Sequence, residues 1–192
     1  MARLNAKIHE VIVVTLGPTG QAHLAPMGIS EYQGLLQIKP FKPSATYDNL
    51  KHHPFCSINY IDDVRVFAGA LTGRRDWPVK ACQQIEGVFL NHALAHSEVK
   101  IDYYDDDGER ACFYGEVIAD YDHAPFRGYN RAQSAVIEAA ILVSRLTLLP
   151  EQKIRDEIRY LRIAIDKTAG EREQEAWNWL MEKVTQAGIN IE

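Results

Sequence analysis

The hydrophobic pattern of this 192-residue chain changes once, near residues 122–130, and that change limits the folds open to it. Before it, apolar residues come in short runs separated by Pro, Gly and Asp, or alternate with polar ones, as in β-strands. After it, they recur every three or four positions, as in helices. We therefore expect an α+β fold with one domain at 1–125 and a second at 126–192, because Pro125 and Gly128 interrupt both patterns.

Several segments of the first domain are predicted strands. Residues 8–16 are rich in β-branched side chains and end at the turn signal "GPTG". The runs "LLQIKPF", "PFCSINYI" and "VRVFAGAL" are predicted to follow as shorter strands, and residues 97–121 alternate on both sides of "DDDG", as in a hairpin. Short strands at this spacing indicate an all-β barrel or sandwich.

The second domain is predicted to hold three helices. Residues 130–149 carry two apolar faces, so this helix is expected to be buried on two sides. Pro150 ends it or starts the next, in which Ile154, Ile158 and Ile165 mark an amphipathic stripe. A third stripe begins near Trp177 and closes at Gly188.

Composition bears on the partners of the protein. A net charge of -5 with no long Lys/Arg run argues against nucleic acid and anionic membrane, so we expect a small-molecule partner. The apolar run 11–14 is too short for a signal peptide or a membrane span, which favours the cytoplasm. Cys56, Cys82 and Cys112 are widely spaced and odd in number, so they predict neither a disulfide framework nor a thiolate zinc site.

The usual catalytic fingerprints are missing from the sequence. It contains no GxSxG, GxxxxGK[ST], HExxH or GxGxxG motif, which lowers the case for acyl transfer, nucleotide hydrolysis, zinc proteolysis and Rossmann-type binding. His92 and His96 stand four apart, a spacing that would put both on one helical face as metal ligands. No third ligand follows nearby, so an exposed helix face is the simpler interpretation and no metal site is predicted.

The stretch "HLAPMGIS", residues 23–30, has the apolar residues of a strand but is poorly suited to pairing. Pro26 lacks a backbone donor and Gly28 lacks a side chain, and both weaken a strand ladder. A bulged edge strand would explain this pattern. A backbone left free for a ligand would also explain it, with Gly28 allowing close approach and Met27 and Ile29 adding apolar contact.

The stretch "SATYDNL", residues 44–50, predicts the start of a helix. Thr46 is expected to cap a helix opening at Tyr47, with Asn49 facing the same end. Such a helix start suits a phosphate, and Lys39 and Lys42 lie just upstream to add positive charge. A capped surface helix is the alternative. Together, the two stretches supply the three features that a flavin-binding site requires: backbone polar groups for the edge of the ring, an apolar surface beneath the ring, and a group that binds the phosphate.

At these residues the chain resembles the FMN-binding split-barrel proteins, which include flavin reductases and pyridoxamine-phosphate-oxidase-like folds. More closely, "APMGI", "TYDNL", "SINYIDD", "NRAQSAVIEAAILVSRL" and "KTAGEREQEAW" resemble domain-of-unknown-function family 447. The resemblance implies a six-stranded antiparallel split barrel that binds FMN at a homodimer interface, followed by a C-terminal helical region.

The resemblance also assigns residues. It implies that the isoalloxazine ring is lined by Ala25, Pro26, Met27, Gly28 and Ile29. The phosphate would be held by Thr46 and Asn49, together with Lys39 and Ser44. Asn59 would lie where the next strand returns beside the site, although a strand end with a turn is an equal interpretation of that position.

These expectations lead to a cytoplasmic, homodimeric FMN-dependent oxidoreductase that exchanges hydride or electrons with a small substrate or reduced carrier. Some relatives suggest a pterin of one-carbon metabolism as that carrier. Because the cofactor carries the chemistry, the lack of catalytic fingerprints agrees with this hypothesis. Two alternatives remain: a flavin-binding or carrier module without turnover, and a split barrel that binds deazaflavin or haem.

Overall fold

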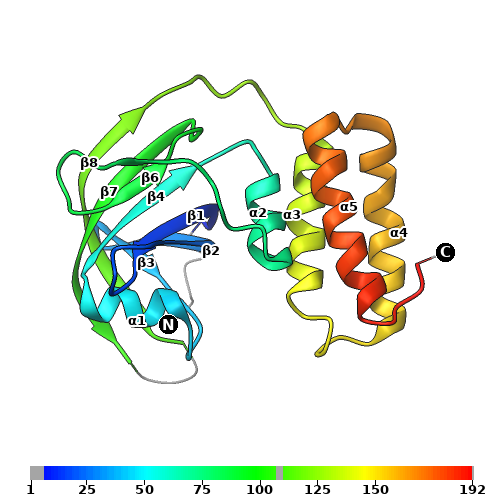
Figure 1. Ribbon diagram of the computed structural model, residues 1–192, viewed down its shortest axis with the longest axis horizontal. Helices are drawn as coiled ribbons and strands as arrows, with labels where there is room; N and C mark the ends of the chain where they lie inside the picture. The colour runs from blue at the N-terminus through cyan, green and yellow to red at the C-terminus, as the bar shows by residue number, and fades with distance from the viewer. Residues whose placement is uncertain (1–6, 107–109, 192) are drawn as a thin grey trace. The chain divides into compact units, whose positions relative to one another are not determined.

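The computed structural model describes residues 7–106 and 110–191, which form two compact units. The first unit contains the described residues up to Ile61 together with Trp77–Pro125. The second contains Asp62–Asp76 and the chain from Phe126 onward. The expected α+β fold, an antiparallel barrel followed by C-terminal helices, is confirmed (Figure 1).

In the described residues, six strands close into an antiparallel barrel. Their order around the barrel is β1 (His9–Leu16), β2 (Ala22–Tyr32), β3 (Leu35–Ile38), β8 (Cys112–Asp122), β7 (Ala95–Asp105) and β4 (Phe55–Tyr60). The predicted hairpin is confirmed as β7 and β8, which carry register shifts near Val99 and Ile101; residues 107–109 of its turn lie outside the described part. Since the barrel closes through the pairing of β4 with β1, these strands present an inner and an outer face.

Alternate side chains of the strands fill the barrel interior. The interior cluster takes Val11 and Val13 from β1, Cys56 and Ile58 from β4, and Phe113 from β8, all nearly or fully buried. Because strand side chains alternate, the residues between them point to the outer face. Helix α1 (Ala45–His52) adds Leu50 and, at the edge, Tyr47 to the same cluster.

A short hairpin lies on the outer face of the barrel. It consists of β5 (Val79–Ala81) and β6 (Val88–Leu90), and β6 lies against β1 and β4. The Ser57 hydroxyl donates to the carbonyl of Val88 at 2.7 Å, and the Leu90 N–H donates to Asn59 Oδ1 at 2.7 Å. The outward-facing polar residues of β4 therefore fasten this hairpin to the sheet.

The run "VRVFAGAL", predicted as a strand, is a helix, and that prediction is wrong. It forms α2 (Arg65–Thr72), which ends at Gly73 with a φ of 84°, the left-handed conformation that favours glycine. Five consecutive residues of α2, Val66 to Ala70, are buried. An apolar run that is buried on all sides has no period, so helix and strand could not be distinguished from sequence.

The helical unit packs α2 with three longer helices, α3 (Arg131–Val143), α4 (Glu151–Thr168) and α5 (Glu171–Gln186). The three predicted helical stripes are confirmed, since Ile154, Ile158, Ile165 and Trp177 lie in one core with Val136. Ala68 of α2 joins that core, which explains why this segment belongs to the helical unit. Among the described residues, no helix combines the length and the apolar character that crossing a membrane requires.

An ion-pair network centred on Arg65, in which only Asp63 is buried, fastens α2 to its neighbours in the helical unit. Asp63 Oδ2 accepts a hydrogen bond from Arg65 Nη2 at 2.7 Å, and Asp63 Oδ1 accepts one from Arg65 Nε at 2.9 Å. Arg65 Nη1 also donates to Glu175 Oε2 of α5 at 3.0 Å. Burial alone would raise the pKa of Asp63, but the hydrogen bonds and charge of Arg65 outweigh it and hold that pKa below its usual range.

Replacing Asp63 with Asn is expected to lower the free energy of unfolding of the helical unit by about 1–3 kcal/mol at pH 7, because Arg65 loses the more buried of its two charged partners, Asp63 and Glu175. In the unfolded chain the pKa of Asp63 is near 4, and in the folded protein it lies below that value. The stabilisation from the ionised carboxylate is therefore fully present above about pH 4 and is lost as the pH falls through the lower pKa of the folded protein. The difference between parent and variant should therefore shrink below about pH 4.

Urea unfolding followed by far-ultraviolet circular dichroism at several pH values measures this effect. Asp166→Asn is the control, since Asp166 is an exposed residue of α4 opposite Arg162, and its effect should stay within about 0.5 kcal/mol. An Asp63→Asn protein as stable as its parent at pH 7 would contradict the prediction.

Candidate functional site

One edge of β2 is paired along only part of its length. Residues Ala22 to Ile29 pair with β1, whereas pairing with β3 begins at Ile29 and ends at Tyr32. On the side away from β1, no strand in the described part of the chain pairs with Ala25–Gly28. The poor pairing predicted for this stretch is thus realised on one edge, and Pro26, which cannot donate to a ladder, is tolerated there.

The side chains of this stretch divide between the two faces of the barrel. Met27 and Ile29 belong to the interior cluster, so Pro26 and Gly28 face outward. A Cβ built on Gly28 would lie 2.7 Å from Ile8 Cγ2 and 3.4 Å from Glu10 Oε1, both side-chain atoms of exposed residues. The side chain of Ile8 therefore lies against the backbone of Gly28, and a side chain at position 28 would have to displace it.

Helix α1 begins two residues earlier than predicted, and its cap is Ser44 rather than Thr46. The Ser44 hydroxyl oxygen accepts the Tyr47 N–H at 3.3 Å, whereas Thr46 lies inside the helix and is buried. The error arose because both residues are good capping types two positions apart. Ser44 thus stands at the helix start, where phosphate binding was expected.

The predicted phosphate residues are not all brought to one place. Asn49 lies on the buried face of α1, and its Nδ2 donates to Thr15 Oγ1 of β1 at 2.9 Å. It also lines a cavity of about 300 Å³ whose other walls include Gly17, His52 and Glu86. Lys39 is exposed and donates to Gln37 Oε1 at 3.1 Å.

Sequence reasoning named Lys42 but missed the charged cluster that it forms with Tyr47, Lys51 and Asp106 on the exposed side of α1. Lys42 Nζ donates to Asp106 Oδ1 at 2.6 Å, the Tyr47 hydroxyl donates to Asp106 Oδ2 at 2.8 Å, and Lys51 Nζ donates to that hydroxyl at 3.2 Å. The hydrogen bond with Tyr47 raises the pKa of Lys51, so its ammonium group is charged at neutral pH. Two lysines thus flank one carboxylate beside α1, which leaves a positive surface.

The side chain of Asn59 forms hydrogen bonds with β1, β4 and the β5–β6 hairpin. It is fully buried on the outer face, its Nδ2 donates to Ser57 Oγ at 2.9 Å and to the Ile12 carbonyl at 3.2 Å, and its Oδ1 accepts from Leu90. These contacts join Asn59 of β4 to β1 and to the β5–β6 hairpin.

His92 and His96 do not share a helical face. His92 is exposed in the turn before β7, while His96 lies within β7 and is buried. The helical spacing was therefore the wrong pattern for these two residues, and the neighbours of His96 come from strand geometry instead.

Comparison with protein families gives two matches that together span most of the chain. Residues 9–123 match the model described as "Protein of unknown function (DUF447) N-terminal domain", and residues 130–182 match "Protein of unknown function (DUF447)". No match was found among curated proteins.

Comparison with solved structures supports the fold. The FMN-bound DUF447 protein MM1853 of Methanosarcina mazei aligns with a TM-score of 0.81 and 20% identity over 94% of this chain and 96% of its own. The 2-nitrobenzoate 2-nitroreductase NbaA of Pseudomonas fluorescens aligns with a TM-score of 0.52 and 17% identity over 63% of this chain and 67% of its own. An FMN-binding protein of Thermus thermophilus aligns with a TM-score of 0.53 and 16% identity over 67% of this chain and 79% of its own.

Replacing Asn59 with Ala is expected to lower the free energy of unfolding by about 2–3 kcal/mol, because the buried Leu90 N–H loses its acceptor. The affinity of the folded variant for FMN should stay within about twofold of the parent. Thermal unfolding and flavin fluorescence titration measure the two quantities, with Asn91→Ala in the turn after β6 as the control. A variant of parental stability that has lost flavin affinity would instead make Asn59 a ligand-binding residue.

Proposed function

Since the chain belongs to the DUF447 family, we propose that its barrel binds FMN at the free edge of β2 and acts as a flavin-dependent oxidoreductase. The observation that carries the proposal is the backbone of Ala25–Gly28, which has no strand partner on one side in the described residues. The FMN in the Methanosarcina mazei relative, which aligns over nearly the whole chain, supports it.

The residues at this edge fit a flavin. Backbone C=O groups of Ala25–Gly28, and the N–H groups of those residues other than Pro26, would meet the polar rim of the ring, and Gly28 adds no side chain of its own at this edge. Pro26 and its outward-facing neighbours add apolar contact. A flat, polar-edged ring needs this combination of free backbone groups and apolar contact.

The phosphate would lie near the start of α1. Ser44 and the first N–H groups of the helix form a donor set there, and the positive ends of Lys42 and Lys51 lie on the exposed side of the same helix. Thr46 and Asn49, which are buried on the other side of α1, would act by fixing the helix against β1. Lys39 would contribute charge from the surface.

When bound, the flavin supplies hydride or electron transfer, and the chain supplies binding, orientation and tuning. The backbone donors of the β2 edge would favour negative charge on the ring's polar rim. The lysines beside α1 would add to the same field and attract anionic substrates. The substrate class that fits these features is a small reduced or reducible carrier.

We extend the proposal to a homodimer. Tyr160 and Ile163 of α4 expose 74% and 49% of their surface. They border a cavity of about 260 Å³ between α3 and α4 that is lined mainly by apolar atoms. Exposed apolar surface beside a groove of this kind is typical of a protein contact.

Replacing Gly28 with Val is expected to lower the affinity for FMN by at least about tenfold, because a branched side chain would displace Ile8 and crowd the β2 backbone. The fold should persist, since the atoms nearest to a Cβ at this position belong to the side chains of the exposed residues Ile8 and Glu10. Ala22→Val, on the same face of the same strand, is the matched control and should bind FMN normally. Flavin fluorescence quenching and circular dichroism measure the two outcomes, and unfolding of the Gly28 variant would mean that Gly28 serves the barrel.

Turnover is tested by anaerobic stopped-flow reduction of the flavin-loaded protein with NADH, NADPH and a reduced deazaflavin. We expect at least one donor to bleach the flavin faster than it bleaches free FMN, because the bound ring is oriented and held among backbone donors. If none of the three reduces the bound flavin, the protein is a flavin-binding module and the oxidoreductase proposal fails. The absorbance spectrum of the isolated protein distinguishes FMN from deazaflavin and haem.

A further inference from the structure

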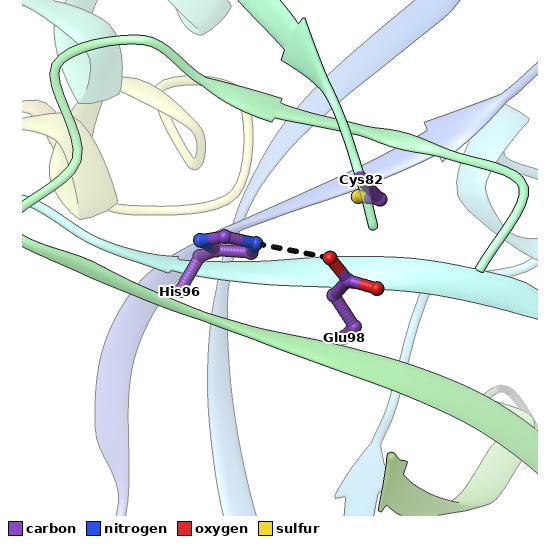
Figure 2. Close-up of side chains that lie close together, drawn as sticks. All are labelled: Cys82, His96 and Glu98. Atoms are coloured by element: carbon purple, nitrogen blue, oxygen red, sulfur yellow. Dashed lines mark hydrogen bonds and ion pairs between the residues drawn. The ribbon is translucent and has the colours of Figure 1, made fainter. Parts of the chain in front are cut away.

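Three side chains of metal-ligating type meet on the outer face of the barrel. His96 and Glu98 stand two apart on β7, so they point to the same side, and both side chains are fully buried. Cys82, just after β5, is half-buried and faces them (Figure 2). One nitrogen, one sulfur and one carboxylate oxygen from these residues all lie within 4.8 Å of one another.

The Glu98 carboxylate is held in a fixed orientation by the loop that follows Cys82. Its Oε1 accepts the Gln83 N–H at 2.7 Å, and its Oε2 accepts the N–H groups of Gln84 at 2.6 Å and Ile85 at 3.0 Å. Each carboxylate oxygen can accept about two hydrogen bonds, so one position remains on Oε1. That position faces His96 Nε2, which lies 3.4 Å away.

The His96 ring is fixed just as firmly. It stacks on Phe89 with a centroid distance of 3.9 Å and on Tyr121 with one of 4.9 Å. Its Nδ1 lies 2.8 Å from Nε2 of the exposed His123. A metal-bound histidine is typically oriented in this way, with one nitrogen toward the ion and the other hydrogen-bonded to an outer group.

We propose that Cys82, His96 and Glu98 form a binding site for a divalent transition-metal ion, for which Zn²⁺ is the best match. Tetrahedral Zn²⁺ with nitrogen and oxygen ligands at its usual bond lengths separates them by about 3.4 Å, as His96 Nε2 and Glu98 Oε1 already are. The sulfur would sit about 3.6 Å from each, so Cys82 has to move in by about 1.2 Å at most. The half-buried position of Cys82 permits this movement.

Charge and ligand softness favour the same ion. One thiolate and one carboxylate balance the two positive charges of the ion, and with a neutral imidazole as the third ligand the occupied site has zero net charge. Binding would release one proton, from the Cys82 thiol, and it requires the tautomer of His96 whose proton is on Nδ1, the nitrogen that lies 2.8 Å from His123 Nε2. A thiolate and an imidazole select Zn²⁺ over Mg²⁺ and Ca²⁺, which prefer oxygen ligands.

Three protein ligands leave a fourth position on the ion for water or a small ligand. The ion would also join the loop at Cys82 to strand β7. Glu98 of β7 already holds that loop by accepting three hydrogen bonds from its backbone N–H groups. The site is separate from the proposed flavin edge, so its test does not depend on flavin binding.

The test uses the full chain freed of metal with a chelator, both with and without FMN. Zn²⁺ titrated against a competing chelator should bind one ion per chain with a Kd below roughly 1 µM. Cd²⁺ as a probe should produce a sulfur-to-metal charge-transfer band, since one ligand is a thiolate. Cys82→Ser should abolish that band and weaken Zn²⁺ binding at least about tenfold.

Matched controls separate this site from other metal-binding groups. Cys112→Ser replaces another half-buried free cysteine, and His92→Gln replaces an exposed histidine near β7, so both should bind like the parent. His96→Gln should lose binding as Cys82→Ser does; if it fails to fold, the comparison of Cys82→Ser with Cys112→Ser decides. Absence of one-to-one binding, or equal binding by the parent and Cys82→Ser, would overturn the proposal.

Discussion

The backbone hydrogen bonds of β2 set the character of this protein. Its pairing with β1 is continuous from Ala22 to Ile29, but its pairing with β3 covers only four residues, from Ile29 to Tyr32. The barrel still closes, because β3 passes on to β8 and β4 returns to β1. Closure therefore leaves a stretch of backbone at Ala25–Gly28 without a strand partner in the described residues, and unused backbone groups at a surface are a natural contact for a polar-edged ligand.

The outer face of the same sheet carries a different kind of polar chemistry. Outward-facing Ser57 and Asn59 of β4 and Glu98 of β7 each bond to the backbone of the segment that contains β5 and β6. Buried polar groups are tolerated when every hydrogen-bonding position has a partner. Among the described residues no buried side-chain nitrogen or oxygen lacks one. The outer layer is thus held by specific hydrogen bonds as well as by apolar packing.

Much of this architecture follows from local patterns, and the failures have physical causes. The alternation in β7 and β8 and the stripe of Ile154, Ile158 and Ile165 depend on neighbours along the chain, so period alone finds them. The α2 helix was missed because it is apolar on every side, and the cap of α1 because Ser44 and Thr46 are both capping types. Cys82 and Glu98 meet only through the folded loop, and no spacing in the sequence signals a contact sixteen residues apart.

The register of the sheet connects the two candidate sites. Pro26 pairs with Ile12, Ile12 with Asn59, and Asn59 with His96, so these outward-facing residues form one row across four strands. Adjacent strands lie about 4.8 Å apart, which places His96 about 14 Å along the sheet from Pro26. That distance is too great for one ion to touch a ring bound at the β2 edge. Between them lies Asn59, whose side chain bonds to both the sheet and the hairpin, so the two sites share one hydrogen-bonded outer face and remain separate in position.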